Sequence, residues 1–245
     1  MENLLSSLEV KVTYQETDYC GNYRMSTLVS QLSDLATENA IKVGIWKPSL
    51  GANYGFVLAK KTIILKRPIK IDEQIKLYTR AAGRKRIQFI RNYWIEDEQG
   101  NEIAAIYSLW TLIDLKKRRI TKPEKIGIVM PELKEYQYSI DSYHDIKDDL
   151  KLDYMMTRSV LYSDVDVNLH MNNSRYIEWA LDVIPLEVFK DQYFREISVF
   201  FKKEMAPNTQ AKIYCYLDDD YAKVVFKSLD EQLTFFEFGG YLENY

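Results

Sequence analysis

The sequence contains few of the residues that build metal centres and disulfide frameworks. Its 245 residues include only two cysteines, Cys20 and Cys215, and two histidines, His144 and His170. There is no C-x-x-C pair and no cysteine–histidine cluster, so we predict no metal site and no cofactor. The two cysteines lie far apart in the sequence, which favours a reducing, cytoplasmic setting over a disulfide framework.

Long apolar stretches and a strong charge of one sign are also missing. No run approaches the roughly 18 apolar residues that a membrane-spanning helix needs. The first residues, M-E-N-L-L-S-S-L-E-V-K, lack the basic stretch and apolar core expected of a secretory signal. The net charge of −3 gives no indication of nucleic acid or an anionic membrane as partner. With 47% hydrophobic residues, the chain has ample material for one large domain or two small ones.

Hydrophobic periodicity predicts two rounds of one element order. The first round has a half-buried strand, an amphipathic helix closed by Gly44, and four strands rich in β-branched and aromatic residues. A polar stretch then indicates a surface connector, after which a strand, a helix and four strands follow again. The expected ranges are 8–15, 25–43, 57–66, 74–81, 87–96 and 103–115 in the first round, 116–150 for the connector, and 155–162, 174–184, 194–203, 210–217, 221–228 and 232–242 in the second.

Residue identities point to duplication of one unit. A shift of 148 residues aligns identities up to the helix, a shift of 136 aligns more beyond it, and the difference, 148 − 136 = 12, marks an insertion in the first copy at the loop 46–55. We therefore expect two similar units that bury together what one alone would expose. The aligned pairs are Tyr14 and Tyr162, Asp18 and Asp166, Ser26 and Ser174, Asp34 and Asp182, Lys66 and Lys202, Gln74 and Gln210, Lys76 and Lys212, and Tyr78 and Tyr214.

Residues 163–173, S-D-V-D-V-N-L-H-M-N-N, gather an acid, an amide and an imidazole at the start of the second helix. Their polar–apolar alternation predicts an extended segment that buries one face, with the helix beginning near Asn172 or Ser174. Backbone N–H groups at a helix start carry partial positive charge and can polarise a carbonyl group. A histidine titrates near neutral pH, and carboxylates can orient it or activate water. The combination suits carbonyl hydrolysis.

The first copy lacks these groups at its matching turn, E-T-D-Y-C-G-N-Y-R-M. Cys20 occupies the position of Asn168 and Asn22 that of His170, whereas the aspartate is kept. We therefore expect one reactive site per chain.

A purely structural role is the alternative for part of this segment. Asp164, Asn172 and Asn173 are as well suited to binding backbone groups in a capped turn as to catalysis. His170 is less easily explained in that way, because it stands between two asparagines at a helix start. His144 lies in the polar connector and is expected to be a surface residue.

The string D-V-N-L-H-M-N-N at 166–173, followed by Tyr176, Ile177 and Trp179 in the helix, closely resembles the active-site segment of plant and bacterial acyl-acyl-carrier-protein (acyl-ACP) thioesterases. Residues 86–114, which include Ser-x-Trp, are similar to a strand–turn–strand passage of that family. Y-F-R-E-I at 193–197 resembles a further family segment with an acidic residue after arginine.

What the resemblance implies is an α+β double hotdog fold. Each of two fused units wraps a long helix in an antiparallel sheet, and the two sheets join side by side. The expected division is an N-terminal unit at 1–130 that binds the acyl chain without catalysing, a connector at 131–153, and a catalytic unit at 154–245.

By position, the family's functional residues map onto Asp166, Asn168, His170 and Glu196. Plant members have a cysteine directly after that glutamate, but Ile197 stands there, so a cysteine nucleophile is excluded. We expect direct attack by water that Glu196 and His170 activate. Asn168 would hold the thioester carbonyl or the imidazole, and Asp166 would orient its neighbours.

The resemblance also implies the substrate, a fatty acyl chain on acyl carrier protein, which is hydrolysed to free fatty acid in fatty acid biosynthesis. Asn172 and Asn173 are candidate substrate-binding residues. The stripe Met25, Leu28 and Leu32 is a candidate lining for the acyl tunnel, with ordinary core packing as its alternative. The loop 46–55 is placed to cover the tunnel mouth.

The carrier, with its 4'-phosphopantetheine-linked acyl chain, is the expected partner. Carrier proteins are acidic, so the docking face should be basic. No nucleic acid and no membrane span is expected, and the sequence leaves open whether two chains form a homodimer. The candidate basic clusters are Arg84, Lys85 and Arg86, then Lys116 to Arg119, then Lys202 and Lys203.

Three other functions fit the same residues. The first is a thioesterase acting on coenzyme A thioesters, which would use the same catalytic groups. The second is a hotdog dehydratase or hydratase, which pairs a histidine with a carboxylate. The third is a non-catalytic acyl-carrier binding module, which the intact acid–amide–imidazole set of the second copy argues against.

Overall fold

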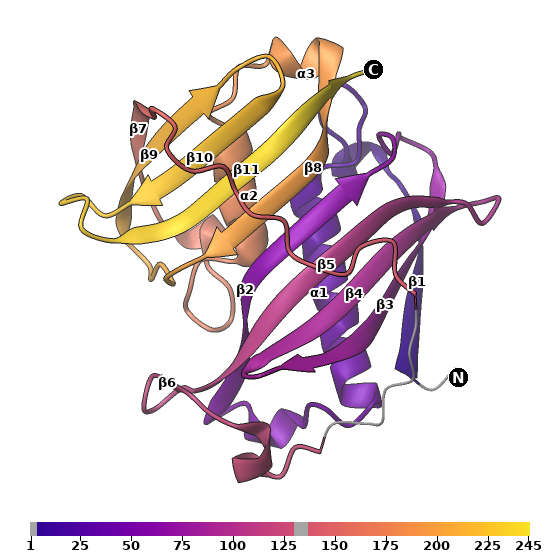
Figure 1. Ribbon diagram of the computed structural model, residues 1–245, viewed down its shortest axis with the longest axis vertical. Coiled ribbons are helices and arrows are strands. Elements are labelled where there is room, and N and C mark those ends of the chain that lie inside the picture. Colours follow the sequence, from indigo (N-terminus) through magenta and orange to yellow (C-terminus); the bar gives the residue numbers. More distant parts are fainter. Residues whose placement is uncertain (1–3, 130–136) are drawn as a thin grey trace.

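The computed structural model describes residues 4–129 and 137–245 and contains both predicted rounds of elements (Figure 1). The first unit consists of β1 (Leu5–Lys11), α1 (Met25–Lys42), β2 (Tyr54–Leu65), β3 (Gln74–Lys85), β4 (Gln88–Asp97), β5 (Glu102–Asp114) and the short β6 (Arg119–Ile120). The second consists of β7 (Asp153–Ser159), α2 (Asn173–Leu181), α3 (Val188–Asp191), β8 (Gln192–Phe201), β9 (Gln210–Leu217), β10 (Tyr221–Lys227) and β11 (Thr234–Asn244).

One antiparallel sheet runs through both units, in the order β1-β3-β4-β5-β2-β8-β11-β10-β9-β7. The corresponding strands β2 and β8 form the seam, with five residue pairs centred on Thr62 and Ser198. The hydroxyl oxygens of these two residues lie 2.9 Å apart, and the 136-residue shift relates them. An approximate two-fold axis therefore passes through the seam, and the arrangement is the double hotdog expected from the resemblance.

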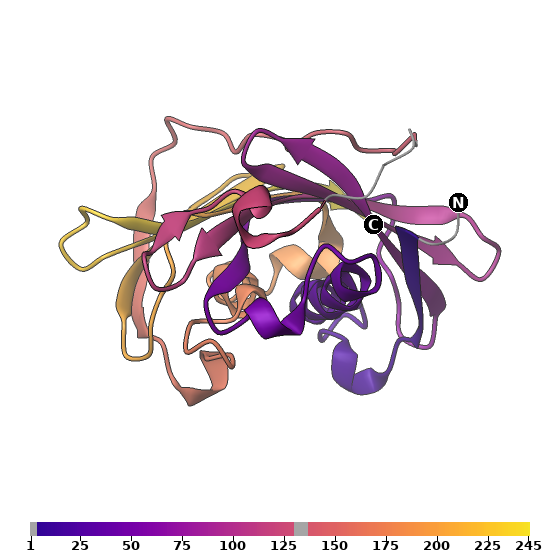
Figure 2. The ribbon, with the colours of Figure 1, turned by 90° about the horizontal axis from the view of Figure 1, so that it is seen from below.

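Both long helices lie on the same face of the sheet and pack against each other (Figure 2). α1 buries Leu28, Leu32 and Leu35 at the three- and four-residue spacing of an amphipathic helix. α2 has nine residues against the 18 of α1, and Pro185 soon after its end cannot continue a helix. Within the part of the chain that the structure describes, no helix is both long enough and apolar enough to cross a membrane.

The duplication recurs in individual hydrogen bonds. Met171 N donates to Met205 O at 2.8 Å, and the shifted pair, Tyr23 N and Ile69 O, makes the same bond at 2.7 Å. The bond joins the turn before each helix to the loop that comes after β2 in one unit and after β8 in the other, so the two shifts describe a real structural equivalence. Residues with positive φ also match, namely Gly21 with Leu169 and Asp72 with Asn208.

The described end of the connector, residues 137–152, crosses the sheet on the face opposite the helices (Figures 1 and 2). Ile140 is buried there against Ala105 and Tyr107, and its carbonyl accepts a hydrogen bond from Asn92 Nδ2 at 2.7 Å. Residues 130–136, which include the predicted boundary at 130/131, lie outside the described part of the chain.

Candidate active site

Residues 163–172 form a compact turn, not the extended segment that their alternation predicted. Val165 and Met171 face each other in an isolated bridge, and Leu169 has a φ of 59°. Val167 and Leu169 are 98% and 69% exposed, so the apolar residues do not share one buried face. The reason is that aspartate and asparagine side chains bind nearby backbone groups and stabilise turns in place of extended backbone.

Asp166 fixes the backbone of this turn. Its Oδ1 accepts hydrogen bonds from Asn168 N at 2.8 Å and from His170 N at 3.5 Å. Asp18, the matching aspartate of the first unit, accepts from the two equivalent N–H groups, both at 2.9 Å. Turn formation therefore explains why this aspartate is present in both copies. Asp166 holds the backbone of Asn168 and His170 in place through these two hydrogen bonds.

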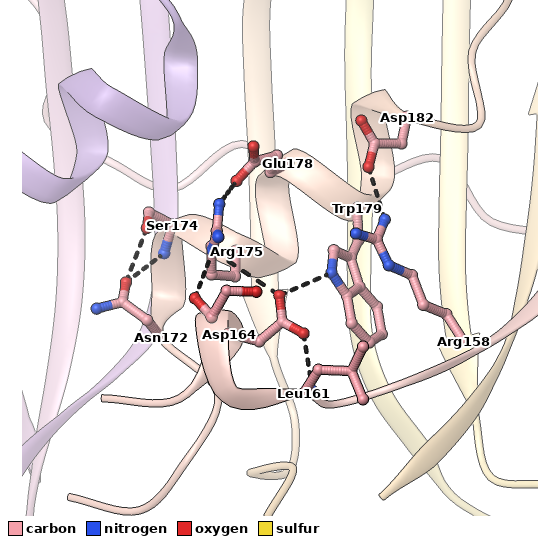
Figure 3. A network of polar contacts seen from close by, with 10 residues as sticks. Arg158, Leu161, Asp164, Asn172, Ser174, Arg175, Glu178, Trp179 and Asp182 are labelled. Atoms are coloured by element: carbon pink, nitrogen blue, oxygen red, sulfur yellow. Dashed lines mark hydrogen bonds and ion pairs between the residues drawn. The ribbon is translucent and has the colours of Figure 1, made fainter. Parts of the chain in front are cut away.

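A buried polar network supports the turn from below (Figure 3). Asp164, only 4% exposed, accepts hydrogen bonds from Leu161 N at 2.9 Å and from Trp179 Nε1 at 3.2 Å. Asn172 caps α2, because its Oδ1 accepts from both the backbone N–H of Ser174 at 2.9 Å and its hydroxyl at 2.8 Å. For Asp164 and Asn172, the contacts favour the structural alternative.

His170 is paired with a glutamate other than the predicted one. Its Nε2 lies 3.3 Å from Oε2 of Glu204, which follows the end of β8. The same oxygen lies 3.2 Å from Nη1 of Arg118, a residue of the first unit beyond β5. The side chains of His170 and Glu204 are 24% and 38% exposed, so water can reach both.

Glu196 lies on the other side of the sheet. Its Oε1 is 3.0 Å from Nδ1 of His144 in the connector, and it does not line the cavity beside His170. The sheet separates Glu196 from the helix face, so the carboxylate that the structure brings to His170 is that of Glu204. The sequence holds a signal for Glu204 in the string K-K-E at 202–204, which stands at the end of a predicted strand and, like R-E at 195–196, has an acidic residue after basic ones.

A cavity of about 1130 Å³ opens beside the His170–Glu204 pair. The predicted residues Asp166, Asn168, His170 and Asn173 line it from the second unit. Its other walls come mainly from the first unit and are rich in apolar and aromatic side chains, including Ile45, Trp46, Phe56, Phe89 and Trp110. A polar end beside a long apolar body has the character of a site for an acyl group with a reactive carbonyl.

The predicted acyl lining does not reach this cavity. Met25 and Leu28 line a separate space of about 80 Å³ beside the first-unit turn, together with Asn22. Leu32 is fully buried in the core. The reason is that this stretch of α1 packs between the sheet and α2, whereas the large cavity contacts the later residues Ala36, Thr37 and Ala40.

The basic clusters fall into two groups. Arg84, at the β3–β4 turn, is 2.7 Å from Oε1 of Glu124, and Lys85 and Arg86 are exposed on the same turn. Lys202, Lys203 and Arg118 line the cavity beside Glu204. Among the described residues, no three His, Cys, Asp or Glu side chains lie close enough to share a metal ion.

A helix wrapped by a curved antiparallel sheet, present twice in one chain and joined across one seam, defines the class of double hotdog proteins. Comparison with known protein families identifies the family within this class. The acyl-ACP thioesterase N-terminal domain matches residues 5–126, and the acyl-ACP thioesterase C-terminal domain matches residues 131–234. The chain belongs to the acyl-ACP thioesterase family.

Individual relatives agree with this assignment. An acyl-[acyl-carrier-protein] hydrolase of Cuphea viscosissima is 27% identical over 161 residues, which are 61% of this chain and 38% of the relative. A second hydrolase from that plant is 24% identical over 199 residues, or 74% and 46% of the two chains. The chain thus matches less than half the length of these curated relatives.

Solved structures show the same fold. An acyl-ACP thioesterase from Bacteroides thetaiotaomicron superposes with a TM-score of 0.86 at 23% identity, over 99% of both chains. The 12:0-ACP thioesterase of Umbellularia californica superposes with a TM-score of 0.82 at 13% identity, over 100% of this chain and 99% of that one. At these identities the likeness concerns architecture.

Proposed function

We propose that this chain hydrolyses the thioester between a fatty acyl chain and acyl carrier protein, releasing free fatty acid in fatty acid biosynthesis. The observation that carries the proposal is the His170–Glu204 pair at the polar end of a large apolar cavity. Family membership supports the reaction class. We also propose a cytoplasmic setting.

In the proposed mechanism, His170 and Glu204 activate a water molecule that attacks the thioester carbonyl carbon. Glu204 accepts from His170 or from water, and Arg118 holds the same carboxylate oxygen in place. The attack forms a C–O bond and a tetrahedral oxyanion. Collapse of that intermediate breaks the C–S bond, and the thiolate takes up the proton as the carrier leaves.

The backbone N–H groups at the start of α2 are not all available to bind the oxyanion. At the start of α2, Ser174 N donates to Asn172 Oδ1 and Arg175 N donates to Asn172 O, so both are occupied. Asn173 N has no partner within the described residues, and Asn173 lines the cavity. We therefore propose that the backbone N–H of Asn173 and the side-chain amide of Asn168 donate hydrogen bonds to the oxyanion. Asp166 holds in place the turn that contains Asn168 and precedes Asn173.

The carrier would approach over the basic residues at this end of the cavity. Arg118 and Lys203 lie beside Glu204, where the phosphate of a phosphopantetheine arm would pass if its thioester is at His170. The predicted cluster Arg84, Lys85 and Arg86 stays in the proposal as a more distant docking surface, with Arg84 already occupied by Glu124.

The test is thiol release from acyl-ACP and acyl-coenzyme A thioesters of graded length, with His170→Ala alongside. We expect release from the carrier-linked series and a loss of about 10²- to 10⁴-fold in the variant. Release from coenzyme A thioesters alone would move the proposal to an acyl-coenzyme A thioesterase. No release from any thioester would contradict hydrolysis and favour a dehydratase or a binding module.

A further inference from the structure

Glu204 lies in a loop, because β8 ends at Phe201. Loop residues move more than residues of strands. The contact with Arg118 engages the carboxylate, but the two side chains are 64% and 38% exposed, and an exposed ion pair holds a side chain only weakly. Other contacts must therefore hold the backbone beside Glu204 if its carboxylate is to stay next to His170.

Met205, the residue directly after Glu204, is held at both of its backbone groups. Its carbonyl oxygen accepts a hydrogen bond from Met171 N at 2.8 Å. Its N–H donates to Tyr176 Oη, on α2, at 2.8 Å. Since Met171 directly follows His170, these two bonds join the segment that carries the histidine, the helix and the loop that carries the glutamate.

Tyr176 is itself firmly placed. Its side chain lines the large cavity, and the residue is only 3% exposed. Burial raises the pKa of its hydroxyl above the ordinary value, so the group that accepts the Met205 N–H is neutral. The ring packs against three aromatic side chains, Phe201, Phe226 and Phe236, at centroid distances of 5.4, 6.2 and 5.2 Å. The peptide between Glu204 and Met205 is thus anchored to a rigid part of the second unit.

The first unit shows that the fold itself does not need this anchor. The shift of 148 places Leu28, which has no hydroxyl, at the position of Tyr176, and the shift of 136 places Pro68 at that of Glu204. The bond equivalent to that between Met171 and Met205 is nevertheless kept. The hydroxyl therefore occurs in the copy in which a glutamate has to be held beside a histidine.

We propose that Tyr176 is a positioning residue for the reaction. Its hydroxyl, through the N–H of Met205, holds Glu204 where its carboxylate can act with His170. The proposal rests on the proposed function, because it concerns how the reactive pair is held in place and adds no contact between Tyr176 and the substrate.

Tyr176→Phe tests this role, because it keeps the packed ring and removes only the hydroxyl. A displacement of about 1 Å at a reacting group can lower a rate by about 10²-fold, so we expect kcat to fall by about 10- to 100-fold. The cavity walls are unchanged, so KM should stay within about twofold. The loss should be equal for acyl-ACP and acyl-coenzyme A thioesters, since both present the same reacting group.

Tyr221→Phe is the matched control. Tyr221 is 2% exposed, and its Oη accepts a hydrogen bond from the backbone N–H of Lys147 at 3.0 Å, on the face of the sheet opposite the helices. Both variants therefore lose the same kind of buried hydrogen bond, and thermal unfolding should show similar losses of stability. Tyr221→Phe should keep the parent's kcat. An equal fall of kcat in both variants would overturn the proposal.

A double variant shows whether Tyr176 acts through Glu204. In a Glu204→Gln background there is no carboxylate left to position, so Tyr176→Phe should cause no further loss of kcat. The same fold-loss in the parent and in the Glu204→Gln background would mean that the two residues act independently, and it would contradict the positioning role.

Crystal structures of the parent and of both tyrosine variants separate this proposal from the hydrolytic one, because they need no turnover. We expect the distance between His170 Nε2 and Glu204 Oε2, 3.3 Å here, to exceed hydrogen-bond reach in Tyr176→Phe and to be unchanged in Tyr221→Phe. That result would support the positioning role even if no thioester is cleaved. An unmoved Glu204 together with an unchanged kcat in Tyr176→Phe would overturn it even if hydrolysis is established.

Discussion

The two strand-to-helix turns have nearly the same backbone and very different surroundings. Both are closed by an aspartate that accepts two backbone N–H groups. At the second turn His170 contacts Glu204 beside a cavity of about 1130 Å³, while at the first Asn22 accepts from Lys70 Nζ at 2.6 Å and the adjoining space is about 80 Å³. A common scaffold thus presents a reactive pair in one copy and a closed polar contact in the other.

The closure of the first site has identifiable causes. The 136-residue shift places Pro68 at the position of Glu204, so no carboxylate can pair there. Phe189, Phe194 and Tyr245 of the second unit line the small space beside this turn, and Asn22 Nδ2 donates to Tyr245 Oη at 2.6 Å.

The open cavity, by contrast, depends on the first unit's longer helix and its inserted loop. Trp46, Gly51 and Tyr54 of that loop region line it. Under the proposed function each unit therefore supplies what the other lacks: the second unit would carry the reactive turn, and the first would build most of the cavity for the acyl chain.

The largest predicted effect is a loss of activity on substitution of Glu204 but not of Glu196. Glu204→Gln keeps the side-chain shape but removes the negative charge and leaves one acceptor oxygen in place of two. A neutral amide cannot take up a proton from His170 or water as a carboxylate can, so kcat/KM should fall by about 10²- to 10⁴-fold. Glu196→Gln is the matched control, because it changes a glutamate of the same strand region whose carboxylate pairs with His144 of the connector, on the other face of the sheet. Thiol release under steady-state conditions measures both.

The reverse result would restore the assignment made from the sequence. If Glu196→Gln lost activity to that degree and Glu204→Gln did not, the seam of the sheet would have to take part in catalysis. Circular dichroism and thermal unfolding of both variants would exclude loss of fold as the reason.

Substitutions beside the large cavity and beside the small space are expected to have different effects, both smaller than that of Glu204→Gln. Ala81 lines the large cavity near Arg91, so Ala81→Leu should shorten it and reduce kcat/KM for the longest chains by about tenfold. Leu28, beside the small space and 2% exposed, should behave in the opposite way. Leu28→Ala should cost about 2–5 kcal/mol of unfolding free energy and leave chain-length preference unchanged.

Relative kcat/KM over a graded series of chain lengths, together with urea unfolding, tests this pair of variants. A changed length preference in Leu28→Ala would show that α1 lines the acyl path at the residues first predicted.

The sequence predicted the elements better than the contacts between them. Alternation and helical spacing are local, so the ranges of α1 and of β3 to β5 were placed within a few residues. The two shifts likewise identified positions that make equivalent backbone hydrogen bonds. Asp166 and His170 could be singled out because their chemistry stands within one short string.

Two kinds of feature could not be predicted from the sequence: the face of the sheet that a side chain takes, and contacts between segments that are far apart in the chain. Glu196 and Glu204 both follow basic residues, and only the sheet geometry shows that Glu196 faces the connector. The contact of Arg118 with Glu204 joins residues 86 positions apart. The pairing of Lys61 on β2 with Ser108 on β5, and of Ser108 with Arg91 on β4, depends on the register of three strands, which periodicity alone does not fix.

The smallest predicted effect concerns two adjacent asparagines that the sequence could not tell apart. Asn172 caps α2, and α2 has only nine residues, so Asn172→Ala should lower the unfolding free energy by about 1 kcal/mol. Arg24, at the matching position before the longer α1, makes no side-chain cap. Asn173 lines the cavity instead. Asn173→Ala keeps the backbone N–H that we assign to the oxyanion but removes the polar side chain from the cavity wall, so it should raise KM and change stability by less than about 0.5 kcal/mol.

The two variants control each other in one experiment that combines urea unfolding with steady-state kinetics. The expected result is crossed, with stability lost in Asn172→Ala and substrate affinity lost in Asn173→Ala. A raised KM in Asn172→Ala without loss of stability would mean that its cap can be released to bind substrate. In that case the turn would act as a moving part of the site, because the cap now joins Asn172 Oδ1 to the first turn of α2 through both Ser174 bonds.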